Sequence, residues 1–218
     1  RAIGSTSPMC LALAFRIGAE SDAGVPFDGK IDDIKVYNRA LSVDEVSKLA
    51  HTAVPIQPVD TGLVGHWTFD GNDIDWSNAS AEIKDVSGRG NHGDALGSLA
   101  TTSVIPGKLG QALSFNGTSD ITVSDRASLE FTTSQLTLSA WVKWDIFPVA
   151  DSYTSQSVIG RNDNGVGSRY ELYFFRGGGS LQLDFLVRPS GVLGPYNLYT
   201  DYGFNTNQWY YIVAVYNN

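Results

Sequence analysis

Residues 136–144 read Leu-Thr-Leu-Ser-Ala-Trp-Val-Lys-Trp, and this stretch decides the fold class. Apolar residues recur at every second position, which is the pattern of a β-strand with one buried face. Residues 170–175, 181–187 and 209–216 are also rich in strand-forming residues. The last of these runs, Trp-Tyr-Tyr-Ile-Val-Ala-Val-Tyr, carries such residues on both faces and therefore predicts a central strand.

Turn-forming residues separate these runs. Clusters of Gly, Asn, Asp and Ser occupy residues 88–93, 116–117, 162–167 and 177–179. Many short strands divided by such turns predict a β-sandwich or a β-barrel.

One short helix is predicted near residues 42–50. Ser42 can cap its N-terminus and Glu45 follows three residues later, which is the spacing of a capping box. Residues 51–61 contain two prolines and no periodic apolar pattern, so they predict a linker or a wrapped loop.

The composition argues against several classes of protein. Of the 218 residues, 42% are hydrophobic, which is enough to build a full core, and the net charge is −8. An acidic chain argues against nucleic acids and anionic membranes as partners. The longest apolar run is about seven residues, far short of the ~20 that span a membrane. Cys10 is the only cysteine and is predicted to be a small buried core residue.

Three groups of motifs carry a family resemblance. Residues 27–42 read Phe-Asp-Gly-Lys-Ile-Asp-Asp-Ile-Lys-Val-Tyr-Asn-Arg-Ala-Leu-Ser. Residues 62–70 read Gly-Leu-Val-Gly-His-Trp-Thr-Phe-Asp and precede the turn at 85–93, and residues 106–117 precede the strand at 136–144. Together they resemble the laminin-G-like, concanavalin-A-like jelly rolls of secreted bacterial and archaeal proteins. The resemblance implies an all-β fold, an antiparallel jelly-roll β-sandwich, at an extracellular or cell-surface location.

The order of the motifs departs from that family. In laminin-G-like domains the Trp-x-Phe-Asp strand comes first and the Gly-x-Ile-Asp-Asp strand comes last, whereas this chain has the reverse order. Residues 1–50 therefore correspond to the C-terminal strands of a sandwich, 51–61 to a linker, and 62–218 to the N-terminal and middle strands.

Three explanations of this order stay open. The chain is a window cut from a tandem array, or a circular permutant folded as one sandwich, or a subunit whose residues 1–50 complete a neighbouring sandwich. The third arrangement covers the exposed sheet edges with strands of similar or identical neighbours, and it builds filaments when the head-to-tail contact does not close.

The resemblance also implies a structural Ca²⁺ where the first and last strands of the family meet. It assigns the ion to Asp32, which would give a carboxylate oxygen, and to Asp70 and Gly71, which would give mainly carbonyl oxygens. The alternative for Asp32 is a set of hydrogen bonds from turn N–H groups or from Arg39, because a carboxylate beside apolar positions needs a partner. Asp33 is expected in solvent on the opposite face.

Two catalytic motifs are missing from the sequence. It has neither a Gly-x-Ser-x-Gly elbow nor the Glu-x-Asp-x-Glu strand of glycosidases on related jelly rolls. Asp85 and Ser87 are predicted to form a local turn, and residues 162–165 a hairpin loop rather than half of an EF-hand. We therefore expect a non-enzymatic protein.

Glycan binding would need exposed aromatic rings together with planar polar groups. Trp144, Tyr153, Arg161 and Tyr170 are the candidate ligand-binding residues, because they could line one face or a loop rim. The expected function is an extracellular structural or adhesive module that assembles with its neighbours. The alternative is a carbohydrate-binding module of a larger secreted enzyme, with glycans as partners.

Overall fold

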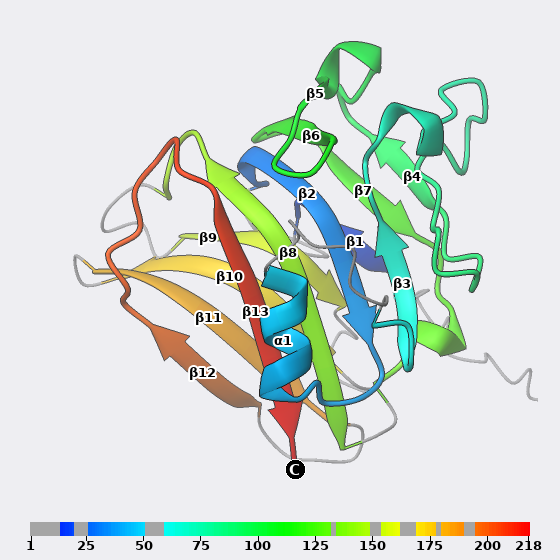
Figure 1. The fold of residues 1–218 in the computed structure, drawn as a ribbon. Helices are drawn as coiled ribbons and strands as arrows, with labels where there is room; N and C mark the ends of the chain where they lie inside the picture. Colours follow the sequence, from blue (N-terminus) through cyan, green and yellow to red (C-terminus); the bar gives the residue numbers. More distant parts are fainter. Residues whose placement is uncertain are drawn as a thin grey trace, which may run out of the picture.

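The chain folds as a β-sandwich in a computed structural model, which confirms the predicted jelly-roll class (Figure 1). Two antiparallel sheets face each other, and one short helix lies on the outer face of the second sheet. The structure describes residues 14–19, 26–50, 59–131, 134–148, 154–161, 169–177, 180–189 and 195–218. Cys10 and the predicted hairpin loop at 162–165 lie outside the described residues.

In the part of the chain that the structure describes, the first sheet has seven strands in the order β12-β11-β10-β9-β1-β7-β4. All its ladders are antiparallel, and a register shift between Leu172 and Tyr173 marks a bulge in the pairing of β10 with β9. The strands are β1 (Phe15–Ile17), β4 (Gly93–Leu96), β7 (Asp120–Val123), β9 (Thr154–Arg161), β10 (Arg169–Gly177), β11 (Ser180–Arg188) and β12 (Tyr196–Thr200).

The second sheet has the order β13-β8-β2-β6-β5, with β3 also paired to β2. The prediction of a central strand at 209–216 is wrong, because β13 stands at the edge of this sheet. The aromatic residue on its outer face packs on the neighbouring strand instead of on another sheet: Tyr211 lies against Trp141 of β8, with 4.9 Å between the ring centroids. The strands are β2 (Asp28–Tyr37), β3 (Leu63–Trp67), β5 (Val104–Pro106), β6 (Gln111–Asn116), β8 (Gln135–Trp144) and β13 (Tyr210–Asn217).

The N-terminal strands occupy interior positions in both sheets. In the first sheet β1 lies between β9 and β7, and in the second β2 lies between β8 on one side and β6 and β3 on the other. Residues 28–31 pair with β6 and residues 34–37 with β3. β1 and β2 therefore share one sandwich with the strands that follow residue 62 in this structure.

Aromatic side chains fill the space between the sheets. Phe15 of β1 stacks on Trp67 of β3 at 5.1 Å, and Trp144 of β8 lies 4.0 Å from Phe174 of β10, so both contacts join the two sheets. All four side chains are buried. Each buried aromatic residue stabilises the fold by roughly 1.5–3 kcal/mol. Ile31 of β2 belongs to the same buried cluster, so β1 and β2 both contribute to one core.

The predicted helix is present as α1 (Val43–Ala50), and its capping box is confirmed. The Ser42 backbone N–H donates to Glu45 Oε2 at 2.9 Å, and the Glu45 N–H donates to Ser42 Oγ at 3.3 Å. Arg39 adds a paired contact to the same carboxylate, and this hydrogen-bonded pair lowers the pKa of Glu45 to about 2. Within the described residues, no helix has both the length and the apolar character that a membrane span requires.

Candidate metal centre

The candidate site is built at an irregularity in β2. The pairing of β2 with β8 is irregular between Asp32 and Lys35, and Asp33, inside this irregularity, has a left-handed backbone with φ of 49°. A bulge of this kind re-aims side chains next to it. The Asp32 carboxylate lies on the outer face of the second sheet, yet it is fully buried, because the loop between β5 and β6 covers it.

The covering loop binds one oxygen of Asp32 and leaves the other without a partner. Oδ2 accepts the backbone N–H groups of Lys108 at 2.7 Å and Leu109 at 2.8 Å. Oδ1 is buried and has no hydrogen-bond partner among the described residues. Burial raises the pKa of Asp32 to about 7, against the two N–H donors that lower it, and the nearby carboxylates of Asp33 and Asp70 raise it further. A buried oxygen of this kind is costly unless a proton or cation satisfies it.

Asp70 holds the other side of the same loop. Its Oδ1 accepts the backbone N–H of Gln111 at 2.7 Å, and the Gly71 N–H donates to Gln111 Oε1 at 2.8 Å. Glycines allow this close approach, since a Cβ at Gly107 would lie 2.6 Å from Asp32 Oδ2 and a Cβ at Gly110 would lie 2.3 Å from Asp70 Oδ1. One loop therefore connects both predicted ligand carboxylates.

The chemistry of these donors fits Ca²⁺. The ion takes six to eight oxygens from carboxylates, carbonyls and water. Asp32 offers its free Oδ1, while the carbonyls of Asp70 and Gly71 each accept one N–H in the turn η1 (Gly71–Asp73) and keep a second lone pair. Among the described residues no group of three or more His, Cys, Asp and Glu side chains converges, so carbonyl and water oxygens would have to complete the coordination of an ion here.

The sequence allows two other partners for Asp32, turn N–H groups and Arg39, and the structure confirms the first and not the second. Turn N–H groups do bind its carboxylate, but they come from a loop far away in the sequence. Arg39 does not contact it and pairs with Glu45 instead.

The expectation that Asp33 lies in solvent is wrong. The carboxylate is nearly buried, its Oδ1 lies 2.7 Å from His66 Nε2, and its Oδ2 pairs with Lys35. Burial alone would raise the pKa of Asp33, but the hydrogen bond from His66 and the charge of Lys35 lower it to about 2. The bulge at Asp33 removes the simple alternation on which the prediction was based.

The turn that precedes β4 confirms the structural role predicted for Asp85. Its Oδ1 accepts the backbone N–H of Ser87 at 2.9 Å, and its Oδ2 accepts the Ser87 hydroxyl at 2.9 Å. The same carboxylate also accepts backbone N–H groups of His66 and Asn91. Asp85 therefore fixes the local backbone.

A comparison with protein families agrees with this architecture. The family model described as the concanavalin A-like lectin/glucanases superfamily matches residues 3–47 and 115–218, which is well over half of the chain. The chain belongs to the concanavalin A-like lectin/glucanase superfamily. This confirms the resemblance to laminin-G-like jelly rolls. No curated protein and no solved structure matches the chain.

In this superfamily member, the predicted glycan platform does not lie on a surface. Trp144 and Tyr170 are completely buried, and the Tyr170 hydroxyl donates to the Leu129 carbonyl at 2.9 Å. Arg161 is also buried and lies 3.0 Å from Asp125. The prediction that they line an exposed face is therefore wrong, because β8, β9 and β10 turn these side chains toward the interior of the sandwich. Tyr153 lies outside the described residues.

Sequence reasoning missed a polar group on the outer face of the first sheet. Asp184 on β11 lies directly opposite Tyr173 of β10 and Tyr199 of β12. Asn197 Nδ2 donates to Asp184 Oδ1 at 3.2 Å, while Asp184 Oδ2 is buried without a partner among the described residues. Burial raises the pKa of Asp184 and, together with the nearby carboxylates, raises that of Tyr173 to about 12. The strand register that gathers these residues was not predictable from a single segment.

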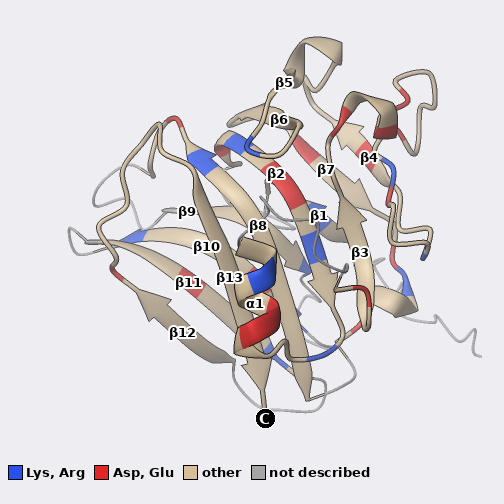
Figure 2. Ribbon diagram, viewed as in Figure 1, with Lys and Arg blue, Asp and Glu red and all other residues tan. Residues whose placement is uncertain are grey.

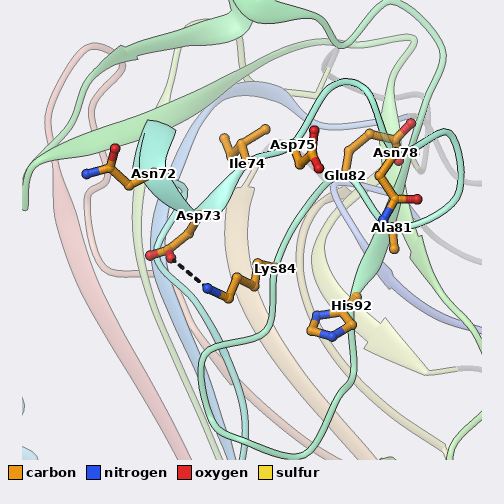
Figure 3. A pocket seen from close by; sticks show the side chains of 9 residues that line it. All are labelled: Asn72, Asp73, Ile74, Asp75, Asn78, Ala81, Glu82, Lys84 and His92. Carbon is orange, nitrogen blue, oxygen red and sulfur yellow. Dashed lines mark ion pairs between the residues drawn. The ribbon is translucent and has the colours of Figure 1, made fainter.

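A polar cavity of about 240 Å³ lies beside η1. Lys84 Nζ lies 3.8 Å from Asp73 Oδ1 at its side, and Figure 3 shows this ion pair. Glu82 Oε2 accepts the Ala95 N–H at 3.1 Å, and His92 Nδ1 accepts a backbone N–H at 3.1 Å. These contacts explain the polar groups as local structure. The lining residues are Asn72, Asp73, Ile74, Asp75, Asn78, Ala81, Glu82, Lys84 and His92.

Proposed function

We propose that this chain is a non-catalytic structural module of a secreted or cell-surface assembly. In this proposal, residues 14–50 of one molecule supply the interior strands of the next sandwich, and Ca²⁺ strengthens the junction. The structure described above is then the closed form, in which one chain makes the same contacts with itself.

One observation carries this proposal. Among the described residues β1 and β2 do not pair with each other: β1 pairs with β7 and β9, and β2 with β3, β6 and β8. All these partners follow the linker in the sequence. An N-terminal segment that pairs with later strands and not within itself can be donated to a neighbouring molecule, as in strand complementation.

The remaining strands depend on this segment. Without β1 the first sheet divides between β9 and β7, and without β2 the second divides between β8 and β6. Both divisions would expose core side chains and unpaired backbone. When a neighbour provides β1 and β2, the contact is head to tail, and a contact that does not close produces a filament.

The proposed calcium site supports the same junction. Asp32 belongs to the donated segment, whereas Asp70, Lys108 and Leu109 belong to the part that receives it. An ion held by Asp32 Oδ1 together with oxygens of Asp70 and Gly71 would connect the two parts. It would also offset the repulsion between the two carboxylates.

Native mass and particle shape test this function. We expect light scattering and negative-stain microscopy in calcium to show open-ended assemblies that shorten or dissociate when a chelator is added. A single discrete particle of 23.5 kDa at all concentrations would contradict strand donation. Assemblies that are indifferent to the chelator would contradict the calcium site alone.

The non-catalytic role is supported by the absence of a Glu-x-Asp-x-Glu strand from the sequence. Its test is direct, because this superfamily includes glucanases. Incubation with a panel of soluble β- and α-glucans is expected to release no reducing sugar. Sustained release that exceeds a heat-denatured control would overturn this part of the proposal.

A carbohydrate-binding module is the second candidate. It is supported by Tyr199, which is exposed beside the Asp184–Asn197 pair, because an aromatic ring next to planar polar groups suits a sugar. Isothermal titration with soluble oligosaccharides tests it. Binding that Tyr199→Ala abolishes while the fold is unchanged would favour this function, and no heat with any glycan would exclude it for that panel.

A further inference from the structure

The two sheets leave one side of the sandwich open. β12 ends the first sheet and β13 ends the second, so among the described residues β12 pairs only with β11 and β13 only with β8. Two neighbouring cavities of about 240 and 190 Å³ lie between these strands, and both are lined by Phe185, Leu198 and Val215. We call this region, made of β12, β13 and the two cavities, the open side.

Apolar side chains of the open side are exposed although they point toward the core. Leu198 lies directly opposite Phe185, so it faces the space between the sheets, yet 69% of its surface is exposed. Tyr196, which lies opposite the buried Val187, is also exposed, and it meets Tyr216 of β13 across the opening at 5.8 Å between ring centroids. The core therefore reaches solvent here.

The open side carries no charge of its own. Neither β12 nor β13 contains Lys, Arg, Asp or Glu, and no charged residue lines either cavity. Figure 2 shows both strands without charged residues along their whole length. Natural edge strands are often protected by charges, so two adjacent uncharged edges indicate that another polypeptide covers them.

We propose that the open side is a self-association surface, and that its occupant is the open side of a second copy of this chain. Figure 1 shows β12 and β13 running in opposite directions. A two-fold axis parallel to these strands places β13 beside β12 of the second copy, and β12 beside its β13. Because this axis preserves strand direction, both new pairs are antiparallel, like every ladder in the fold.

The self-complementary arrangement explains why the occupant is a second copy. Each molecule presents one free edge from each sheet together with an apolar opening between them, which is what an isologous contact requires. Pairing continues each sheet into a sheet of the partner and merges the two openings into one core. The net charge of −8 does not oppose this contact locally, because the facing strands are uncharged.

Sedimentation velocity and amide exchange of the full chain test the proposal. We expect a complex of two copies, joined at their open sides, whose population rises with concentration. We also expect slower amide exchange in residues 195–217 at high concentration. Leu198→Lys places a charge in the opening and is expected to weaken this association at least about tenfold, with fast exchange at every concentration. Leu198→Ser serves as a milder variant, and Ile146→Lys, at an exposed apolar residue elsewhere, is the matched control.

The outcomes separate this contact from strand donation by residues 14–50. Leu198 lies on β12, which among the described residues pairs with neither β1 nor β2, so the Leu198 variants are expected to leave strand donation intact. Association lost in both Leu198 variants, but retained in Ile146→Lys, supports the proposal. The proposal is overturned if amide exchange at residues 195–217 of the wild-type protein does not slow at high concentration. It is also overturned if Leu198→Lys leaves the association unchanged.

Discussion

The Asp32 carboxylate accepts the backbone N–H of Lys108 at 2.7 Å across 76 positions of sequence. This bond connects the N-terminal segment to the loop that also binds Asp70. It marks the junction on which the sandwich and the proposed calcium site both depend. Altering either side of it therefore tests the stability of the junction and the metal together.

Calcium is expected to stabilise the fold through Asp32. At a concentration 100-fold above Kd, an ion that binds only the folded state contributes about 2.7 kcal/mol, which raises Tm by about 5–10 °C for a chain of this size. Differential scanning calorimetry in calcium and in chelator measures this shift. Asp32→Asn and Asp70→Asn should lose most of it, whereas Asp44→Asn on α1 should keep it. An equal shift in all four proteins would contradict the assignment.

The metal-free protein is expected to lose stability as the pH rises. Burial gives Asp32 a pKa of about 7 in the folded state, against an ordinary value of 3.8, so the folded state binds more protons than the unfolded state between those values. The free energy of unfolding contributed by this group therefore falls from about pH 4 to pH 7. Urea titrations in chelator measure the slope, and Asp32→Asn should flatten it. A slope unchanged in that variant would contradict the burial of this carboxylate.

The loop between β5 and β6 is closely packed at Gly110, so replacing this glycine is expected to lower the free energy of unfolding. Gly110→Ala combines a left-handed φ of 63° with a Cβ that would lie 2.3 Å from Asp70 Oδ1. Gly88→Ala is the matched control, because Gly88 has φ of 81° and open space around it. Denaturant unfolding should show a loss of about 1 kcal/mol for the control and a clearly larger loss, about 2–4 kcal/mol, for Gly110→Ala. Equal losses of stability in the two variants would mean that the loop accommodates a methyl group beside Asp70, which would contradict this prediction.

Burial of Trp144 predicts a structural effect from its removal. Trp144→Ala should lower the free energy of unfolding by about 3–5 kcal/mol, because it leaves a cavity in the core. Tyr199→Ala, at an exposed ring, should change it by no more than about 0.5 kcal/mol. Chemical denaturation of the two variants side by side checks this contrast. A small effect at Trp144 would restore it as an exposed binding residue.

Local signals in the sequence predicted local structure well. The capping box of Ser42 and Glu45 and the turn at Asp85 depend on residues within a few positions, and both formed as expected. Asp32 and Asp70 are brought together only by a loop distant from both, so their hydrogen bonds could not be predicted from sequence. Trp144 could have been placed correctly, since it shares one strand face with the buried Val142.

The errors at Asp33 and β13 have different physical causes. A bulge changes which face each residue of β2 occupies, and period-two reasoning does not reveal a bulge. β13 has strand-forming residues on both faces because its outer face packs Tyr211 on Trp141, so this composition did not distinguish an edge strand from a central one.

Disulfide capture tests strand donation most directly. Lys30 of β2 and Lys143 of β8 lie directly opposite each other, within reach of a cross-strand disulfide. The variant Lys30→Cys/Lys143→Cys, with Cys10→Ser to remove the native thiol, is oxidised as the assembled protein and analysed by non-reducing denaturing electrophoresis. The matching single variants can form dimers at most. Strand donation predicts a ladder of covalent multimers from the double variant, and a product that is only cross-linked monomer would contradict it.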